Sequence, residues 1–322
     1  MMRTSLILRV CALLLCALLL LPLFSSCTAS GERSEKFEIV CTIYPIYDLV
    51  CAVLADRVSD YPVLLLSDNG NDPHNYQPSV KDIASISDAS VLFYVGGASD
   101  AWAEELSQPA KASVALLDAC DVCEGDHDHA HGEGEHHDHG EYDEHFWLSL
   151  MNASAVVEEI LRVLSEMYRD DSDAVTDFCA NAEAYKAELS ALDARYRDMV
   201  AGTALDTIIV ADRFPFLYLV RDYGLSYHAA FPGCSAECDA SFSTVVGLSD
   251  RLRASEISAL IVTETGEREL AETVIRTSGR DGIEILTLHS CQRVTKEDRE
   301  AGVTYLTIME NNLSVLTRAL TP

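Results

Sequence analysis

Basic residues are scarce in this chain of 322 residues. It has 23 lysines and arginines but 52 aspartates and glutamates, which gives a formal net charge of −29 at pH 7. Nucleic acid is a polyanion that such a chain would repel, and the sequence has no cluster of basic residues to attract it. Nucleic acid is therefore excluded as a partner, and cations are the favoured ligands.

The apolar run near the N-terminus is too short to cross a membrane. The run VCALLLCALLLLPLF covers residues 10–24, about 15 residues against the roughly 20 that a spanning helix needs. It follows two arginines and precedes small residues, an order typical of an export signal. We therefore predict that residues 1–26 are a signal peptide rather than a permanent membrane helix.

The end of this signal, FSSC, resembles the lipoprotein box of bacterial exported proteins. In that box the cysteine, here Cys27, is lipidated and becomes the new N-terminus. Phe24 stands three places before it, where leucine is usual. The resemblance implies an extracytoplasmic protein held at the cell membrane by a lipid. The polar residues 27–36 are predicted to be its flexible tether.

Cysteines are too sparse for a disulfide scaffold. Cys11 and Cys16 lie in the signal and Cys27 directly follows it, which leaves eight of the eleven in nearly 300 residues. Cys120 and Cys123 have the spacing of a redox or metal pair, but they could equally be loop thiols. Cys234 could form a disulfide with Cys238 or Cys291, or these thiolates could bind a metal; we favour structural roles.

Short β-branched runs alternate with segments of helical periodicity from residue 37 onward. In the first part of the chain we expect strands at 37–43, 61–67 and 91–97 and helices at 47–58, 80–89 and 101–107. Helical periodicity then extends to residue 201, with one polar break at DDSD. After it we expect strands at 207–213, 225–231, 259–264 and 283–290 and helices at 215–224, 241–255, 269–279 and 304–320.

These segments predict an α/β protein of two similar lobes, each a mostly parallel sheet flanked by helices, joined by a long connecting helix. The N-terminal lobe would cover residues 37–151, the helical linker 152–201 and the C-terminal lobe 202–322. In such sheets, the loops at the carboxyl ends of the strands bind the ligand. Residues just after strands are therefore the candidates for a site.

Three histidines each stand at the edge of a loop, beside a predicted strand or apolar core segment. His74 follows the strand YPVLLLS, His145 precedes the apolar FWLSL, and His289 directly follows the strand IEILTL. Zinc takes about four ligands, and imidazole nitrogen is one of its preferred donors. Histidines from both lobes could therefore close on one ion.

A segment rich in histidine and acid lies before His145. Residues 124–144 hold six histidines, nine acidic residues and several glycines. This composition cannot form a packed core, so we predict that the segment stays mobile. It is either a solvated linker or a weak collector of several zinc ions near the entrance of a tighter site.

Several motifs together resemble the solute-binding proteins of zinc and manganese ABC transporters. They are TIYPIYDLV, DPHNYQPSVKDI, DEHFWLSL, DRFPFLYLVRDYGL and YLTIMENNLSVL, and they occur in family order across the chain after Glu38. The resemblance implies one metal ion held between two domains that a long helix bridges. It also implies delivery of the metal to a membrane permease, and it supports the zinc-collector interpretation of the histidine-rich segment.

The resemblance also carries over ligand positions. The first two histidine ligands match His74 in PHNYQP and His145 in EHFWL. The third ligand falls at Arg213 in ADRFPF, which departs from the family because a guanidinium has no lone pair for a cation. Either Asp212 takes the role by a small shift, or the site uses fewer protein ligands and a water.

The fourth position, acidic in many family members, matches His289. Glu264 follows another strand in VTETG and aligns near the site, where it could ligate the metal or neutralise Arg213. We therefore expect three histidine ligands, with Glu264 or Asp212 completing the shell. Three imidazoles favour zinc over manganese, which suits carboxylate and water better.

Two other functions remain as alternatives to a monomeric metal receptor. A zinc hydrolase would need an open coordination position and a general base, for which Glu264 could be nominated. No HExxH or GxSxG motif is present to support it. A surface adhesin with a metal-stabilised fold has no motif that separates it from a transport receptor.

Overall fold

The computed structural model describes residues 37–68, 73–106, 111–123, 142–233 and 240–322. Four earlier predictions lie outside these residues: the signal, the tether with Cys27, most of the histidine-rich segment, and the pair Cys234 and Cys238. Among the helices of the described ranges, none is long and apolar enough to span a bilayer.

The first sheet is parallel throughout and has the strand order β2-β1-β3-β4. Its strands are β1 (Ile39–Cys41), β2 (Val63–Leu65), β3 (Val91–Tyr94) and β4 (Ser113–Ala115). Every residue of β1 and β3 is buried, as expected for central strands covered on both faces. Sequence periodicity did not predict β4, because its three residues, Ser-Val-Ala, include only one β-branched side chain.

Helices and single turns of 3₁₀-helix follow these strands. They are α2 (Tyr44–Leu54), η2 (Ala55–Ser59), η3 (Pro73–Asn75), α3 (Val80–Asp88), α4 (Ala101–Leu106), η4 (Leu116–Ala119) and η5 (Phe146–Leu148). The start of α3 is fixed by a capping box, in which Ser79 and Asp82 bond to each other's backbone N–H.

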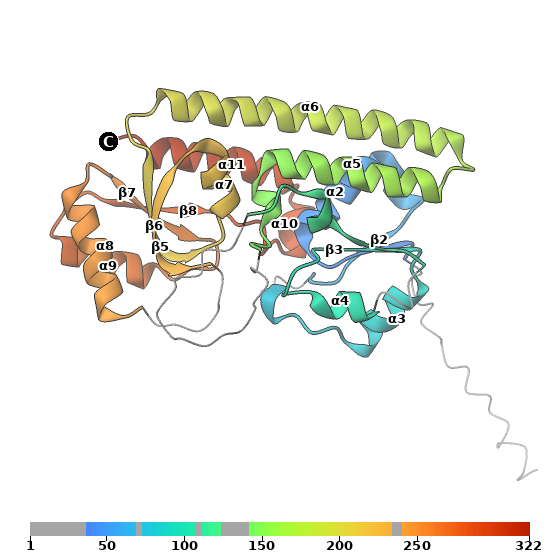
Figure 1. Ribbon diagram of the computed structural model, residues 1–322, viewed down its shortest axis with the longest axis horizontal. Coiled ribbons are helices and arrows are strands. Elements are labelled where there is room, and N and C mark those ends of the chain that lie inside the picture. Colours follow the sequence, from blue (N-terminus) through green and yellow to red (C-terminus); the bar gives the residue numbers. More distant parts are fainter. Residues whose placement is uncertain (1–36, 69–72, 107–110, 124–141, 234–239) are drawn as a thin grey trace, which may run out of the picture. The chain divides into compact units, whose positions relative to one another are not determined.

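Two consecutive helices form the predicted linker: α5 (Leu150–Met167) and α6 (Ser172–Gly202). Asp171 in the polar break caps α6 by accepting the N–H of Ala174 at 3.0 Å. Along α6, Asn181 donates to the carbonyl of Val53 on α2 at 3.1 Å, whereas Tyr196 donates to the carbonyl of Met309 at 2.6 Å. The helix therefore contacts elements from both halves of the chain (Figure 1).

The second sheet is also parallel, with the order β6-β5-β7-β8. Its strands are β5 (Thr207–Phe214), β6 (Ser226–Pro232), β7 (Ala259–Thr263) and β8 (Glu284–Leu288), and its helices are α7 (Leu217–Tyr223), α8 (Phe242–Ala254), α9 (Arg268–Ser278), α10 (Lys296–Glu300) and α11 (Tyr305–Ala319). Gly224 ends α7 with φ of 64°, a left-handed conformation that glycine adopts without strain. The pattern did not predict α10, whose five residues are all charged.

The predicted fold class is confirmed: two four-stranded parallel sheets are flanked by helices and joined by a helical linker (Figure 1). The largest buried cluster holds residues from both halves, including Phe146, Trp147 and Tyr305. Trp147 is 2% exposed, and its carbonyl accepts the hydroxyl of Tyr305 on α11. This packing places the segment around residue 145 beside the second half of the chain.

Candidate metal centre

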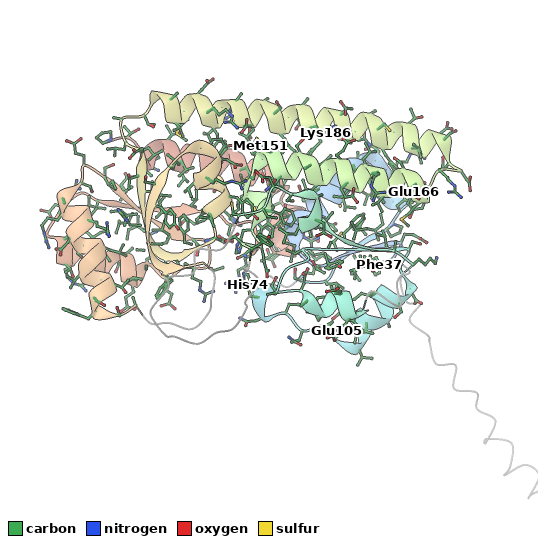
Figure 2. All side chains as sticks on the ribbon, in the orientation of Figure 1. Phe37, His74, Glu105, Met151, Glu166 and Lys186 are labelled. Atoms are coloured by element: carbon green, nitrogen blue, oxygen red, sulfur yellow. The ribbon has the colours of Figure 1, made fainter. Side chains whose placement is uncertain are left out.

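His74 and His145 lie next to each other although they come from distant segments. His74 is in η3, between β2 and α3 (Figure 2). His145 immediately precedes η5. The centroids of the two imidazole rings are 5.4 Å apart, and the ring planes are tilted by 54°. Zinc–nitrogen bonds of about 2.0–2.1 Å suit two rings at this separation, so one ion could contact both.

The His145 ring is oriented by a neighbouring carboxylate. Nδ1 of His145 lies 2.9 Å from Oδ1 of Asp143, and the backbone N–H of His145 donates to the same oxygen at 2.8 Å. Only 4% of the His145 side chain and 8% of the Asp143 side chain are exposed. A carboxylate at this position keeps the proton on Nδ1, so that the lone pair on Nε2 can bind a metal. Many metal-binding histidines are oriented by a carboxylate in this way.

The amide of Gln292 contacts His74 from the loop that follows β8. Its Nε2 is 3.1 Å from Nε2 of His74, and its Oε1 accepts the hydroxyl of Ser290 at 3.4 Å. Sequence patterns did not single out Gln292, because an uncharged amide carries no metal-ligand signal by itself. Its position three residues after His289, in a loop that follows a strand, is the signal that could have found it.

His289 and Glu264 form a second pair, at the carboxyl ends of β8 and β7. Nδ1 of His289 is 3.5 Å from Oε1 of Glu264 and accepts the backbone N–H of Cys291 at 2.9 Å. The Glu264 carboxylate also accepts the N–H and the hydroxyl of Ser290, at 2.8 and 2.6 Å. With Nδ1 as the acceptor, neutral His289 carries its proton on Nε2. A metal at Nε2 therefore requires a change of tautomer, whereas a metal at Nδ1 requires the ring to leave the N–H of Cys291.

Asp212, on β5, bonds to the neighbouring strand. Its Oδ2 accepts the N–H and the hydroxyl of Thr263 at 2.8 and 2.6 Å, and its Oδ1 accepts the N–H of Arg213 at 2.8 Å. Gly266 passes so close that a Cβ there would lie 1.7 Å from Oδ2. Asp212 therefore fastens β5 to the end of β7 and the turn that follows it.

The five predicted ligands form two pairs and a single residue rather than one shell. Within the described ranges, no group of three or more His, Cys, Asp or Glu residues is placed to hold a metal ion. The two pairs are connected by Trp147, whose ring lies 5.2 Å from the His145 ring. Its Nε1 donates to the carbonyl of Ser290, the neighbour of His289, at 2.8 Å.

Three cysteines considered as possible ligands or redox groups are free thiols: Cys120, Cys123 and Cys291. Burial raises the pKa of the Cys120 thiol to about 12 and that of the Cys291 thiol well above its ordinary value. The thiolate, not the thiol, is the form that binds a metal. These raised pKa values favour the thiol form of Cys120 and Cys291 in the metal-free protein, which disfavours both as metal ligands.

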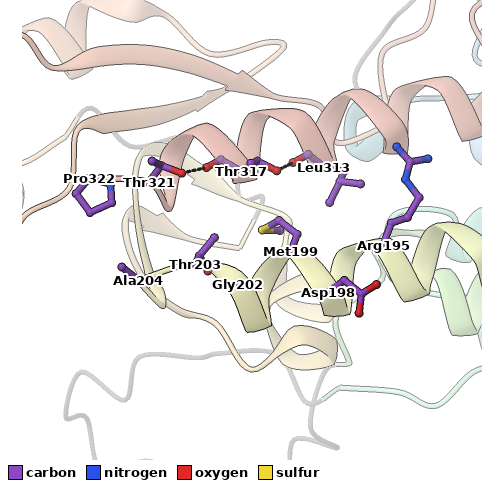
Figure 3. Close-up of a pocket in the computed structure, with 10 residues that line it drawn as sticks. All are labelled: Arg195, Asp198, Met199, Gly202, Thr203, Ala204, Leu313, Thr317, Thr321 and Pro322. Carbon is purple, nitrogen blue, oxygen red and sulfur yellow. Dashed lines mark hydrogen bonds between the residues drawn. The ribbon is translucent and has the colours of Figure 1, made fainter.

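A pocket of about 630 Å³ lies apart from these pairs, between the ends of α6 and α11 (Figure 3). Its walls include Arg195, Met199, Leu313 and Thr317. None of the candidate ligands lines it, so we do not include it in the metal centre.

A family of zinc-uptake proteins and several zinc-binding proteins match nearly the whole chain. The family model described as "Zinc-uptake complex component A periplasmic" matches residues 39–319. The zinc-binding lipoprotein AdcA of Streptococcus pneumoniae is 33% identical over 312 residues, which cover 94% of this chain and 58% of AdcA. The high-affinity zinc uptake system protein ZnuA of Bacillus subtilis is 26% identical over 299 residues, with 91% and 90% of the two chains covered.

Solved structures agree with these matches. The Zn(II)-bound ZnuA-like domain of Streptococcus pneumoniae AdcA superposes with a TM-score of 0.70 at 28% identity, over 89% of this chain and 100% of that one. The metal-dependent lipoprotein YcdH of Bacillus subtilis gives a TM-score of 0.73 at 25% identity, over the same shares. This chain spans 58% of the length of AdcA, the first relative above.

The two parallel sheets and their helical linker give the two-lobed α/β fold that superposes on the Zn(II)-bound ZnuA-like domain of AdcA. The match over residues 39–319 makes the family specific: the chain belongs to the ZnuA family of zinc-uptake components. The resemblance drawn from its motifs is thereby confirmed.

Proposed function

We propose that this protein captures one divalent metal ion, zinc as its main cargo, outside the cytoplasm and delivers it to the permease of an ABC importer. The observation that carries the proposal is the pair His74 and His145, with ring centroids 5.4 Å apart and His145 oriented by Asp143. The relatives support the cargo, because AdcA and ZnuA are named for zinc binding and zinc uptake.

The proposed ligands are His74, His145 and His289, with a carboxylate completing the shell. Glu264 is favoured over Asp212 for this place, because it already lies 3.5 Å from His289. Asp212 belongs to neither pair of candidate ligands, and its carboxylate bonds to Thr263 and Arg213. Three imidazoles favour zinc over manganese.

Export and anchoring are part of the same proposal. We infer that residues 1–26 direct export and that Cys27 carries the lipid, and the name lipoprotein given to AdcA supports this inference. A lipid anchor would keep the receptor close to its permease. The monomeric state stays a prediction.

Metal capture is preferred to the two alternatives weighed from the sequence. The names of the relatives describe zinc-binding and uptake components, and none of those named here describes a hydrolase. No motif in the sequence, and no contact among the residues that the structure describes, favours an adhesin over a transport receptor.

Zinc titration at several pH values tests the proposal directly. We expect one tight zinc ion per protein at pH 7.5 and a steady loss of affinity towards pH 5. Histidine takes up a proton in this range, and a protonated imidazole has no lone pair for the metal. Calorimetry in weakly coordinating buffers gives both stoichiometry and affinity. An affinity that is constant across this range would count against a shell of three histidines.

The histidine-rich segment is expected to be dispensable for tight binding. Its two ends already meet, because the N–H of Asp143 donates to the carbonyl of Cys123 at 3.0 Å. Replacing residues 125–141 with two glycines should therefore preserve the fold around His145. We expect calorimetry to lose any weak zinc binding and to retain one tight site. If the tight site disappears, its placement at His74 and His145 is wrong.

A further inference from the structure

Tyr218, on α7, bonds to residues at both ends of the histidine-rich segment. The hydroxyl of Tyr218 accepts the backbone N–H of Cys123 at 3.1 Å and donates to the carbonyl of Asp143 at 2.8 Å. The backbone bond from Asp143 to Cys123 lies beside it. One hydroxyl therefore bonds to both ends of a segment whose own residues contribute many of the chain's histidines.

The Tyr218 ring is fixed in place. Its side chain is fully buried, and the guanidinium of Arg221 lies over the ring, 5.0 Å from its centroid. The same guanidinium donates to the carbonyl of Asp121 at 3.3 Å. Arg221 therefore bonds to the chain just before the histidine-rich segment. Tyr218, on the same turn of α7, bonds to Cys123 and Asp143 at the two ends of the segment.

Asp143 connects Tyr218 to the proposed zinc ligand His145. The backbone carbonyl of Asp143 accepts a hydrogen bond from the Tyr218 hydroxyl. The side-chain oxygen Oδ1 of Asp143 bonds to both Nδ1 and the backbone N–H of His145. A shift of the Asp143 backbone would move this carboxylate and release Nδ1. The tautomer of the His145 ring therefore depends on where Asp143 is held.

We propose that Tyr218 is a positioning residue for zinc binding: its hydroxyl holds Asp143 so that the His145 ring keeps its proton on Nδ1 and presents Nε2 to the metal. This inference rests on the proposed function for its zinc readout only. The hydroxyl contacts no metal and acts through Asp143. It also means that α7, from the second half of the chain, helps to orient a ligand from the first half.

The variant Tyr218→Phe removes the hydroxyl and keeps the ring. We expect zinc affinity, measured by competition with a chelator, to fall about 10-fold, the lower end of the effect of losing a partner that orients a ligand. In the metal-free protein, nitrogen-detected NMR of labelled histidine should show His145 in the Nδ1–H tautomer for the wild type. The variant should show a mixture of tautomers.

The matched control is Tyr196→Phe. It removes a hydroxyl that is equally buried and bonded to a carbonyl, that of Met309, but lies between α6 and α11. We expect this variant to lower the melting temperature as Tyr218→Phe does, with wild-type zinc affinity and a wild-type His145 signal. Equal losses of affinity in the two variants would show a general effect of packing and would overturn the proposal.

A double-mutant cycle with Asp143→Asn separates the proposed path from a purely local effect. The amide accepts the Nδ1 proton more weakly than the carboxylate, so this variant should also lose affinity. If Tyr218 acts through Asp143, the double variant loses less affinity than the two single losses combined. Fully additive losses would contradict the proposal.

The two inferences can fail separately. If the wild type lacks a tight zinc site, the proposed function fails, and the tautomer of His145 in the metal-free protein still decides the role of Tyr218. If the wild type binds zinc tightly and Tyr218→Phe keeps both its affinity and a single tautomer, only the role of Tyr218 is overturned.

Discussion

Replacing His145 with alanine is expected to weaken zinc binding by about 100-fold or more. The substitution removes a proposed ligand, and losing a group that merely orients a ligand already costs 10–100-fold. Binding can be followed by calorimetry or by tryptophan fluorescence, because the Trp147 ring lies 5.2 Å from the His145 ring. His74→Ala is expected to have an effect of the same order.

The control for this experiment is His228→Ala. His228 lies on β6, where its Nε2 contacts the guanidinium of Arg251 at 3.1 Å, and it belongs to neither pair of candidate ligands. Wild-type zinc affinity is expected for this variant. If His145→Ala bound zinc as tightly as His228→Ala does, His145 would not be a ligand.

Trp147→Ala is expected to have the largest effect on stability among the substitutions considered. Removing this 2% exposed side chain leaves a cavity in the main buried cluster, for which a loss of about 3–5 kcal/mol in the free energy of unfolding is typical. The carbonyl of Ser290 also loses its indole N–H donor. Chemical denaturation followed by circular dichroism measures the change.

The chain has only one other tryptophan, and it supplies the control. Trp102 lies on α4, half-buried, with its ring 5.7 Å from Tyr76. Trp102→Ala should cost clearly less stability than Trp147→Ala, since the site is partly open to solvent. Similar losses in both variants would show that Trp147 does not hold the two halves together in the way its contacts indicate.

The alternation of strands and helices in the fold could be predicted from the sequence, because long buried runs such as those of β5 and β7 give a strong periodic signal. The strand β4 has only one β-branched residue and α10 has no apolar residue, so neither gave such a signal. Predicted boundaries differed where a local bond decides them. For example, α5 begins at Leu150 because Ser149 caps it by accepting the N–H of Asn152.

The rule for parallel sheets correctly placed His289 and Glu264 at the carboxyl ends of β8 and β7, but the pairing of the candidate residues could not be predicted. That His74 meets His145 depends on packing between distant segments. That Asp212 bonds to Thr263 depends on the close approach of Gly266. The contact of Gln292 with His74 depends on the path of a loop, which single residues do not encode.

The long helix α6 bears on how the cargo can enter and leave. It has 31 residues, about 46 Å at 1.5 Å per residue, and it is bonded to α2 near one end and to α11 near the other. A continuous α-helix has no hinge, and bending it sharply would break its internal hydrogen bonds. We therefore expect metal exchange to proceed by rearrangement of the loops at the strand ends, with the two sheets turning little about each other.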